Sequence, residues 1–210
     1  TSLHMACYRG HHHLIPVLLA APGAAVDVVD TTAQSSTPLL LASKKGKIEC
    51  VRVLLAAGAN PNAAQGEDNE EGLGAGWTPL HCACVWGHHL TASALLAAGA
   101  AVDAVTTDES HSTPLLLASG QGHFECVKVL LSAGAAVGAT QANIGWSALH
   151  YSCKSGHHLI ASALVAAGAS VNAVTTDAFH YTPLLFASQE GHLECVKVLL
   201  SAGANRSEEH

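Results

Sequence analysis

The chain has few aromatic and few charged side chains. Aromatic residues make up 4% and charged residues 12% of its 210 positions, whereas charged residues make up roughly 25% of a typical protein. Glycine and charged residues interrupt every apolar run before it reaches the length of a membrane span, so no span is predicted. The formal net charge of −7 at pH 7 argues against nucleic acid as the main partner.

What the chain does contain is an internal repeat. A Thr-Pro-Leu-like element recurs with spacings of 36, 41, 35, 34 and 35 residues. It begins at Thr1, Thr37, Thr78, Thr113, Ser147 and Thr182, which we take as the starts of repeats 1 to 6. A period of this size is typical of an array whose neighbouring repeats share a continuous core. We therefore expect one elongated domain over residues 1–210 that works through a binding surface.

Each repeat carries the signals of two helices and a turn. In repeat 3, Thr78 is the expected cap of a helix that begins with proline. Gly87 can end that helix in a left-handed conformation, and His88 then opens a second apolar helix that Gly99 stops. A short β-like run at 101–103 and several turn formers follow. The pattern predicts helix, helix and projecting turn, repeated along the chain.

These elements resemble the ankyrin repeats. The matching motifs are Thr78-Pro79-Leu80-His81, the Gly122-His123 pair and the Leu-Leu-x-x-Gly-Ala element at 130–135. The resemblance covers essentially all 210 residues. It implies an all-α ankyrin-repeat solenoid of stacked antiparallel helix pairs with projecting β-turn fingers, which binds proteins along its concave face.

The repeats depart from that family in length and alternate in type. They exceed about 33 residues, and the longest connection, near 64–76, carries the acidic run Glu67–Glu71 between glycines. This composition predicts a solvated, mobile loop. Odd repeats 3 and 5 share Gly-His-His-Leu, whereas even repeats share Glu-Cys-Val. A pair of repeats, about 70 residues long, is therefore the unit of duplication.

The seven cysteines follow the repeats. Cys7, Cys84 and Cys153 occupy one equivalent position, Cys50, Cys126 and Cys195 another, and Cys82 is extra. Equivalent positions two repeats apart are too distant for a disulfide, which needs Cα atoms within roughly 7 Å. The pattern predicts buried free thiols in a reducing intracellular compartment, the cytoplasm.

The sequence contains 15 histidines, most of which the repeat itself explains. The resemblance implies that His4, His81 and His150 bond neighbouring backbone groups. A zinc site needs three or four convergent ligands, and neighbouring histidines on a helix point apart, so we expect no metal and no cofactor. Candidate nucleophile and base residues recur from repeat to repeat, as scaffold residues do. We therefore expect no catalytic residues and no enzyme activity.

A binding surface has better support. The resemblance implies recognition by the fingertips, the residue before each Thr-Pro element and the two residues before each Gly-His pair. The residues predicted to contact a partner are Tyr8, Arg9, Lys44, Lys45, Trp77, Val85, Trp86, Gln121, Trp146, Lys154, Tyr181 and Gln189. Aromatic and basic anchors dominate interface energies. We expect Trp77 and Trp86 to border one groove, and the partner to be an acidic or amphipathic protein or peptide.

The alternative for these residues is that Trp77 and Trp146 pack against a neighbouring finger and the lysines are merely solvated. Two other classes of function stay open beside a protein-interaction scaffold. One is a structural segment of a larger or self-associating repeat assembly. The other is a modified substrate, since Asn62 and Asn172 fall at a finger position that, by the resemblance, can be hydroxylated.

Overall fold

The computed structural model describes residues 1–30, 36–66 and 75–205. Apart from an isolated bridge between Thr140 and Ser147, this part of the chain contains helices and turns only. The first helices of the six repeats are α1 (Ser2–Arg9), α3 (Pro38–Lys44), α5 (Pro79–Val85), α7 (Pro114–Gln121), α9 (Ala148–Lys154) and α11 (Pro183–Gln189). The second helices are α2 (Ile15–Leu19), α4 (Ile48–Ala56), α6 (His89–Ala97), α8 (Phe124–Ser132), α10 (His158–Ala166) and α12 (Leu193–Ser201).

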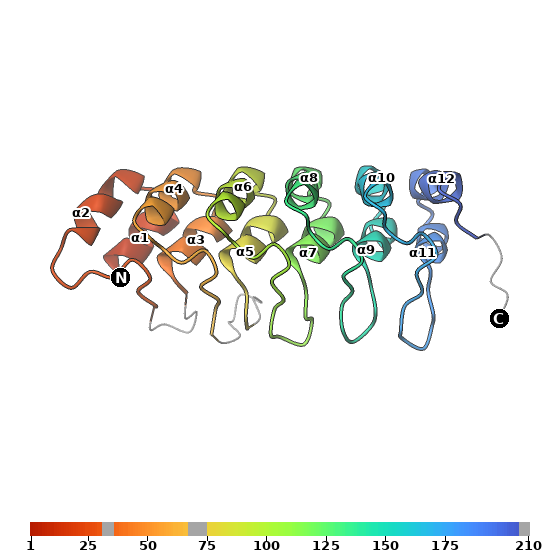
Figure 1. The fold of residues 1–210 in the computed structure, drawn as a ribbon, viewed down its shortest axis with the longest axis horizontal. Coiled ribbons are helices and arrows are strands. Elements are labelled where there is room, and N and C mark those ends of the chain that lie inside the picture. The colour runs from red at the N-terminus through yellow and green to blue at the C-terminus, as the bar shows by residue number, and fades with distance from the viewer. Residues whose placement is uncertain (31–35, 67–74, 206–210) are drawn as a thin grey trace.

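The helices form two rows, and the connections between repeats project to one side. Figure 1 shows the second helices in one row, the first helices in the other, and long fingers that extend beyond the row of first helices. The chain runs steadily from one end of the stack to the other, and among the described residues the main contacts between helices lie within a repeat or between neighbouring repeats. The predicted all-α solenoid with projecting fingers is confirmed.

Small and aliphatic side chains fill the core between the two rows. The largest enclosed side chains number one to three in each repeat and are mostly leucines, such as Leu80, Leu95 and Leu130. Alanines at 42, 83, 118 and 187 are fully buried between first helices, where a larger side chain would hold the helices apart. Burial of each enclosed leucine contributes about 1.5 to 3 kcal/mol to the stability of the fold. The narrow space between the helices accounts for the abundance of alanine and leucine and the scarcity of aromatics.

Threonine or serine caps every first helix, and histidine ties three of the helices to a finger. The Thr78 side chain accepts a hydrogen bond from the His81 amide. Atom Nδ1 of the His81 ring in turn bonds Oγ1 of Thr78 at a distance of 2.9 Å. The other ring nitrogen, Nε2, donates to the carbonyls of Ala104 at 3.0 Å and Ser112 at 3.1 Å. His4 and His150 make equivalent bonds. The predicted structural role of these histidines is confirmed.

The histidines of the Gly-His pairs in repeats 3 to 6 each bond a backbone carbonyl of the preceding repeat. Gly87 has φ of 75°, and a Cβ placed on it would lie 2.6 Å from the ring of His123. That ring donates from Nε2 to the carbonyl of Val85 at 3.0 Å. Gly87 is therefore required both for its left-handed backbone and for the close approach of the histidine. Its predicted role in ending the first helix is confirmed.

The β-like run at 101–103 lies in a turn, because its backbone turns back after Gly99 instead of pairing with a neighbour. Most of the acidic loop near 64–76 falls at 67–74, which lies outside the described residues. The second helix of repeat 1 is also interrupted, since η1 (His12–Leu14) stands before α2 and Pro16 occupies the first turn of α2.

Candidate functional site

The predicted contact residues lie at the ends of the first helices and at the bases of the fingers, but they differ in exposure. Tyr8, Arg9, Trp86, Gln121, Lys154 and Gln189 are exposed. Lys45, Val85, Trp146 and Tyr181 are half-buried. Lys44 and Trp77 are buried, with 8% and 7% of their surfaces exposed. The candidates therefore do not form one continuous accessible strip.

The expected groove between Trp77 and Trp86 is not formed. Trp77 packs with Leu40 and Cys82, and its indole N–H donates to a carboxylate oxygen of Asp108 at 2.9 Å. This bond turns the ring toward the finger, as the alternative interpretation of Trp77 held. Trp86 lies at the end of α5 with 52% of its surface exposed, so of these two tryptophans Trp86 alone is accessible to a partner.

Tyr8 and Lys45 form a small surface pair at the first repeat junction. The Lys45 ammonium nitrogen lies 4.7 Å from the centre of the Tyr8 ring. Such a contact is worth about 0.5 to 1 kcal/mol at an exposed site. It orients the two side chains on the first-helix row.

A larger aromatic group lies on repeats 5 and 6, and we call it the aromatic cluster. It contains Trp146, Tyr151, Phe179, Tyr181 and Phe186, five of the nine aromatic residues of the chain. In a chain so poor in aromatics, this concentration marks one end of the first-helix row as different from the rest.

The rings of the aromatic cluster form a continuous chain of contacts. Trp146 meets Phe186 edge-on at 4.7 Å between ring centres and Tyr151 at 5.1 Å. Tyr181 stacks on Phe186 at 4.7 Å, and Phe179 stacks on Tyr181 at 5.6 Å. Each pair adds about 0.5 to 1.5 kcal/mol beyond its area of burial. Phe179 is 71% exposed, so the cluster runs from the helices to an accessible fingertip.

Lys154 adds a positive charge to the aromatic cluster. Its ammonium nitrogen lies 4.5 Å from the centre of the Trp146 ring and 5.9 Å from that of Phe186. The ion pairs of the described residues join Glu49 to Arg52, Glu125 to Lys128 and Glu194 to Lys197, and none includes Lys154. The charge of Lys154 is therefore held over aromatic rings and remains available to an acidic group.

A groove of about 290 Å³ adjoins this lysine, and we call it the α7–α9 groove. Its lining residues are Ser112, Leu116, Leu117, Gly120, Gln121, Trp146, Tyr151, Lys154 and Ser155. Gly120 occupies the place that Lys44 takes in repeat 2, and a Cβ there would lie 3.3 Å from the Tyr151 ring. The groove is open because this position lacks a side chain.

Hydrogen bonds hold the walls of the groove. The Tyr151 hydroxyl donates to the side-chain oxygen of Gln141 in the preceding finger, and burial raises the pKa of Tyr151. The indole N–H of Trp146 donates to Asp177 at 3.3 Å. Both rings are thus anchored to fingers, which makes the groove a preformed surface.

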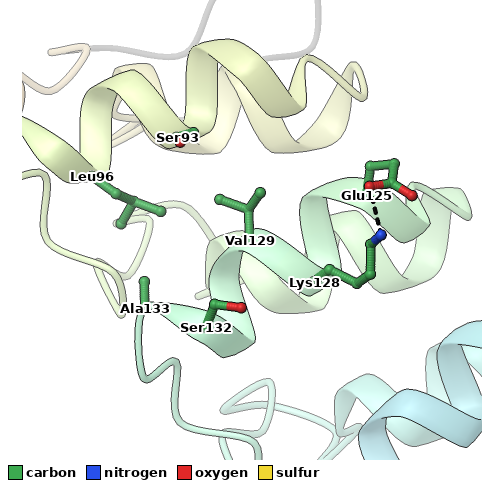
Figure 2. Close-up of a pocket in the computed structure, with 7 residues that line it drawn as sticks. All are labelled: Ser93, Leu96, Glu125, Lys128, Val129, Ser132 and Ala133. Atoms are coloured by element: carbon green, nitrogen blue, oxygen red, sulfur yellow. Dashed lines mark ion pairs between the residues drawn. The ribbon is translucent and has the colours of Figure 1, made fainter.

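A second hollow, of about 510 Å³, lies on the other row of helices between α6 and α8. Figure 2 shows its lining residues, with the Lys128 ammonium turned to Glu125 and the pair 2.8 Å apart. Its two charges satisfy each other, and its remaining walls are Leu96, Val129 and small side chains. It offers a partner fewer anchors than the α7–α9 groove does.

Sequence reasoning found some of these residues and missed others. It named Gln121, Trp146, Lys154 and Tyr181, but not Tyr151, Phe179 or Phe186. Aligning repeats 3 and 4 with repeats 5 and 6 would have found these three, because each replaces a smaller residue at the equivalent position. Among the described residues, no group of three His, Cys, Asp or Glu side chains could hold a metal ion.

Comparisons with known proteins agree with the architecture. The family of ankyrin repeats matches in three copies, at residues 1–65, 63–141 and 134–209. The chain belongs to the ankyrin-repeat family. The crystal structure of the human ASB11 ankyrin repeat domain superposes with a TM-score of 0.80 and 26% identity, over 99% of this chain and 86% of that one. Ankyrin repeats are in general protein–protein interaction modules.

Three curated relatives match parts of the ankyrin array. Ankyrin repeat and SOCS box protein 16 of Homo sapiens is 37% identical over 86 residues, 41% of this chain and 17% of that protein. Glycerophosphocholine phosphodiesterase gde1 of Schizosaccharomyces pombe is 37% identical over 101 residues, 48% of this chain and 8% of its own length. E3 ubiquitin-protein ligase KEG of Arabidopsis thaliana is 34% identical over 105 residues, 50% of this chain and 6% of its own length. The chain therefore spans less than a fifth of each.

None of the described helices has the length and apolar character needed to cross a bilayer.

Proposed function

We propose that this ankyrin array is a non-catalytic scaffold that binds an amphipathic, acidic segment of a partner protein across the ends of α5, α7 and α9. The observation that carries the proposal is the α7–α9 groove, with an aromatic wall on one side and the Lys154 ammonium at its rim. The fold is typically non-enzymatic, and the segments that match this chain are a small part of each relative's length.

The groove suits an apolar side chain next to a carboxylate. Leu116, Leu117 and the ring of Trp146 supply apolar walls, and Lys154 supplies the positive charge. An aromatic anchor that a partner buries contributes on the order of 2 kcal/mol or more, whereas a rim lysine mainly affects the association rate and its salt dependence. Trp86, one repeat away at the end of α5, offers a second exposed anchor.

Peptide display on the immobilised chain, followed by affinity measurements on the selected peptides, tests this proposal. We expect enrichment of peptides that combine acidic and large apolar residues. Gly120→Gln places in repeat 4 the residue type found at the equivalent position of repeat 6, and it should fill the groove and weaken binding at least tenfold. Trp86→Ala should also weaken binding by more than about tenfold.

Two lysines provide a matched control. Lys154→Ala should slow association and reduce its salt dependence, whereas Lys128→Ala, on α8 in the other row, removes the same charge away from the groove. Equal effects of the two variants, or peptides that bind Gly120→Gln as tightly as the parent, would mean that the partner uses another face.

A second candidate is a structural segment of a larger or self-associating repeat assembly. Leu185 and Val196 in repeat 6 are half-buried, whereas their equivalents in repeat 4, Leu116 and Val127, are buried beneath repeat 5. A second copy could cover this face. Light scattering over a range of concentrations separates the two candidates, since a constant monomer mass supports the scaffold and a mass that rises with concentration supports self-association.

A further inference from the structure

Three basic side chains gather at the junction of repeats 1 and 2, and we call them the basic patch. Arg9 is the last residue of α1, Lys45 follows α3 directly, and Lys47 precedes α4. Residues 1–66 contain five of the nine basic residues of the chain and three of its 16 acidic residues. This part of the chain is therefore net positive, although the whole chain has a net charge of −7.

Both lysines reach back across the junction to the end of α1. The ammonium nitrogen of Lys45 lies over the ring of Tyr8, 4.7 Å from its centre. The stem of Lys47 lies against Gly10, where a Cβ would be 3.1 Å from Cδ of the lysine. Arg9 stands between Tyr8 and Gly10 in the chain. The three positive charges thus belong to one small area of surface.

Lys47 takes the place that a histidine occupies in repeats 3 to 6. In those repeats the histidine ring lies against the glycine of the preceding repeat, and its Nε2 bonds a backbone carbonyl there. In repeat 2 a hydrocarbon stem covers Gly10 instead. The exchange keeps the junction packed and adds the positive charge of an ammonium group.

The charges of the basic patch have no acidic partner among the described residues. The ion pairs there join glutamates to Arg52, Lys128 and Lys197, and none includes a member of the patch. Of the acidic residues of repeats 1 and 2, Glu49 is the one that pairs with Arg52. Three like charges that lie close together repel one another, so an anion that binds among them gains from all three.

We propose that the basic patch binds a phosphorylated serine or threonine in a segment of the partner protein. The proposal rests on the scaffold role proposed above and extends the binding surface to α1 and α3. A phosphate group carries a charge of about −1.5 to −2 at pH 7 and three acceptor oxygens. It therefore offers one charge-assisted hydrogen bond to each of the three cationic groups. A carboxylate has two oxygens and about half of this charge.

The distribution of charge favours a phosphorylated peptide over a larger polyanion. Residues 67–210 contain 13 acidic and four basic residues. A nucleic acid or an anionic membrane would extend beyond the patch and be repelled by this part of the chain. A peptide that carries one phosphate contacts the patch alone.

Trp86 indicates what lies next to the phosphate in such a segment. It takes in repeat 3 the position of Arg9 in repeat 1 and Lys45 in repeat 2, and 52% of its surface is exposed. Neighbouring helices pack about 8 to 10 Å apart, and an extended chain rises about 3.3 Å per residue. We therefore expect a large apolar residue about three positions from the phosphorylated one.

The test is selection from a library of peptides of about six residues, each with one fixed phosphoserine and degenerate flanks, on the immobilised full chain. Fluorescence anisotropy then measures the affinity of the selected peptide and of its forms with serine or glutamate in place of phosphoserine. The phosphorylated form should bind at least about tenfold more tightly than either of the other two. Equal binding of the glutamate form, or of the serine form, would overturn the proposal.

Matched variants locate the site. Lys47→His copies repeats 3 to 6, and Arg9→Gln copies Gln121, the equivalent residue of repeat 4, so both should fold, as circular dichroism checks. Each should weaken binding of the phosphorylated peptide about tenfold. Lys128→Gln removes the same charge on α8, in the other row of helices, and should have no effect. Equal losses in all three variants would mean unspecific attraction and would contradict a site.

Two further outcomes separate this proposal from its neighbours. Sedimentation of the chain with vesicles of phosphatidylcholine and phosphatidylserine, lost in Lys47→His, would identify a lipid surface as the ligand and overturn the phosphopeptide. Peptides of about six residues span about 20 Å when extended, too short to join the patch to the α7–α9 groove. If no phosphorylated peptide is selected while other peptides still bind the groove, the phosphate site is wrong and the proposed scaffold role stands.

Discussion

Repeats 3 and 4 and repeats 5 and 6 align residue for residue at an offset of 69 positions, and they carry different surfaces on the same frame. The frame includes the matched pairs Trp77 and Trp146, His81 and His150, Cys84 and Cys153, Asp108 and Asp177, and Cys126 and Cys195. The tryptophans, histidines and aspartates among them make the same hydrogen bonds in both regions. The shared contacts fasten helix to finger and repeat to repeat.

The surfaces differ at a few positions of the first helices and fingers. Moving from repeats 3 and 4 to repeats 5 and 6 changes Cys82 to Tyr151, Val85 to Lys154, Ser110 to Phe179, Ser112 to Tyr181 and Leu117 to Phe186. Trp77 consequently packs among small side chains and is covered, whereas Trp146 becomes one member of an aromatic cluster. The comparison indicates that side chains set on a constant backbone create the candidate binding surface.

The largest expected effect distinguishes Phe186 from its counterpart Leu117. Phe186 is 4% exposed and contacts three other rings or more, so Phe186→Ala should lower the free energy of unfolding by about 3 to 4 kcal/mol. Leu117 is half-buried, and Leu117→Ala should cost about 1 kcal/mol. Urea unfolding followed by circular dichroism measures both, and equal losses would show that the aromatic cluster adds no stability.

The next effect depends on pH and on the histidines that both regions share. Burial lowers the pKa of His81 from 6.5 to about 4. The unfolded chain therefore takes up a proton at this site first, and stability falls as the pH drops from about 6.5 toward 4, by at most about 3 kcal/mol.

His81→Leu should remove most of this loss, because leucine already occupies the equivalent position in repeats 2, 4 and 6. His150→Leu is the matched change in repeat 5, where burial also lowers the pKa of the histidine. Unfolding curves at pH 7 and pH 5 measure how the free energy of unfolding depends on pH. An unchanged pH dependence in His81→Leu would mean that His81 is protonated in the folded protein.

A smaller effect concerns the finger carboxylates. Asp108 accepts from the Trp77 indole at 2.9 Å, the Thr106 hydroxyl at 2.8 Å and the Ser110 amide at 3.0 Å. Asp108→Ala should cost about 2 kcal/mol, because it leaves the buried indole N–H of Trp77 without a partner. Asp177→Ala should cost less, since Trp146 is half-buried and its N–H can reach water. A greater loss in Asp177→Ala would reverse the comparison.

The smallest expected effect on stability comes from exchanging Lys154 for the residue of repeat 3. Lys154→Val should change the free energy of unfolding by less than about 1 kcal/mol, because an exposed cation–π contact contributes little. It should nevertheless reduce the affinity for acidic peptides. Val85→Lys is the reciprocal variant, and a gain of acidic-peptide binding there would show that the charge suffices without the aromatic cluster.

The sequence predicted the frame of this protein well, because local chemistry repeats with the chain. Thr78 and its equivalents were predicted to cap helices, and Gly87 was predicted to end a helix in a left-handed conformation. His81 was predicted to hydrogen-bond backbone groups. All three predictions are confirmed. These features depend on residues within a few positions or on the neighbouring repeat, and the period of the repeat fixes both. The two helices of repeat 3, α5 and α6, lie between the residues that were predicted to start and stop them.

Only the tertiary structure decided which way the side chains between repeats turn. Trp77 was predicted to border a groove, but its indole finds Asp108 in the next finger, about 30 positions away in the chain. The missing side chain of Gly120 opens a groove against Tyr151. The sequence by itself determined the period, the helices and their caps, because each is a short-range property. The burial of Trp77 and the α7–α9 groove depend on how closely successive repeats stack, and that distance is set by the packing of alanine and leucine across every junction.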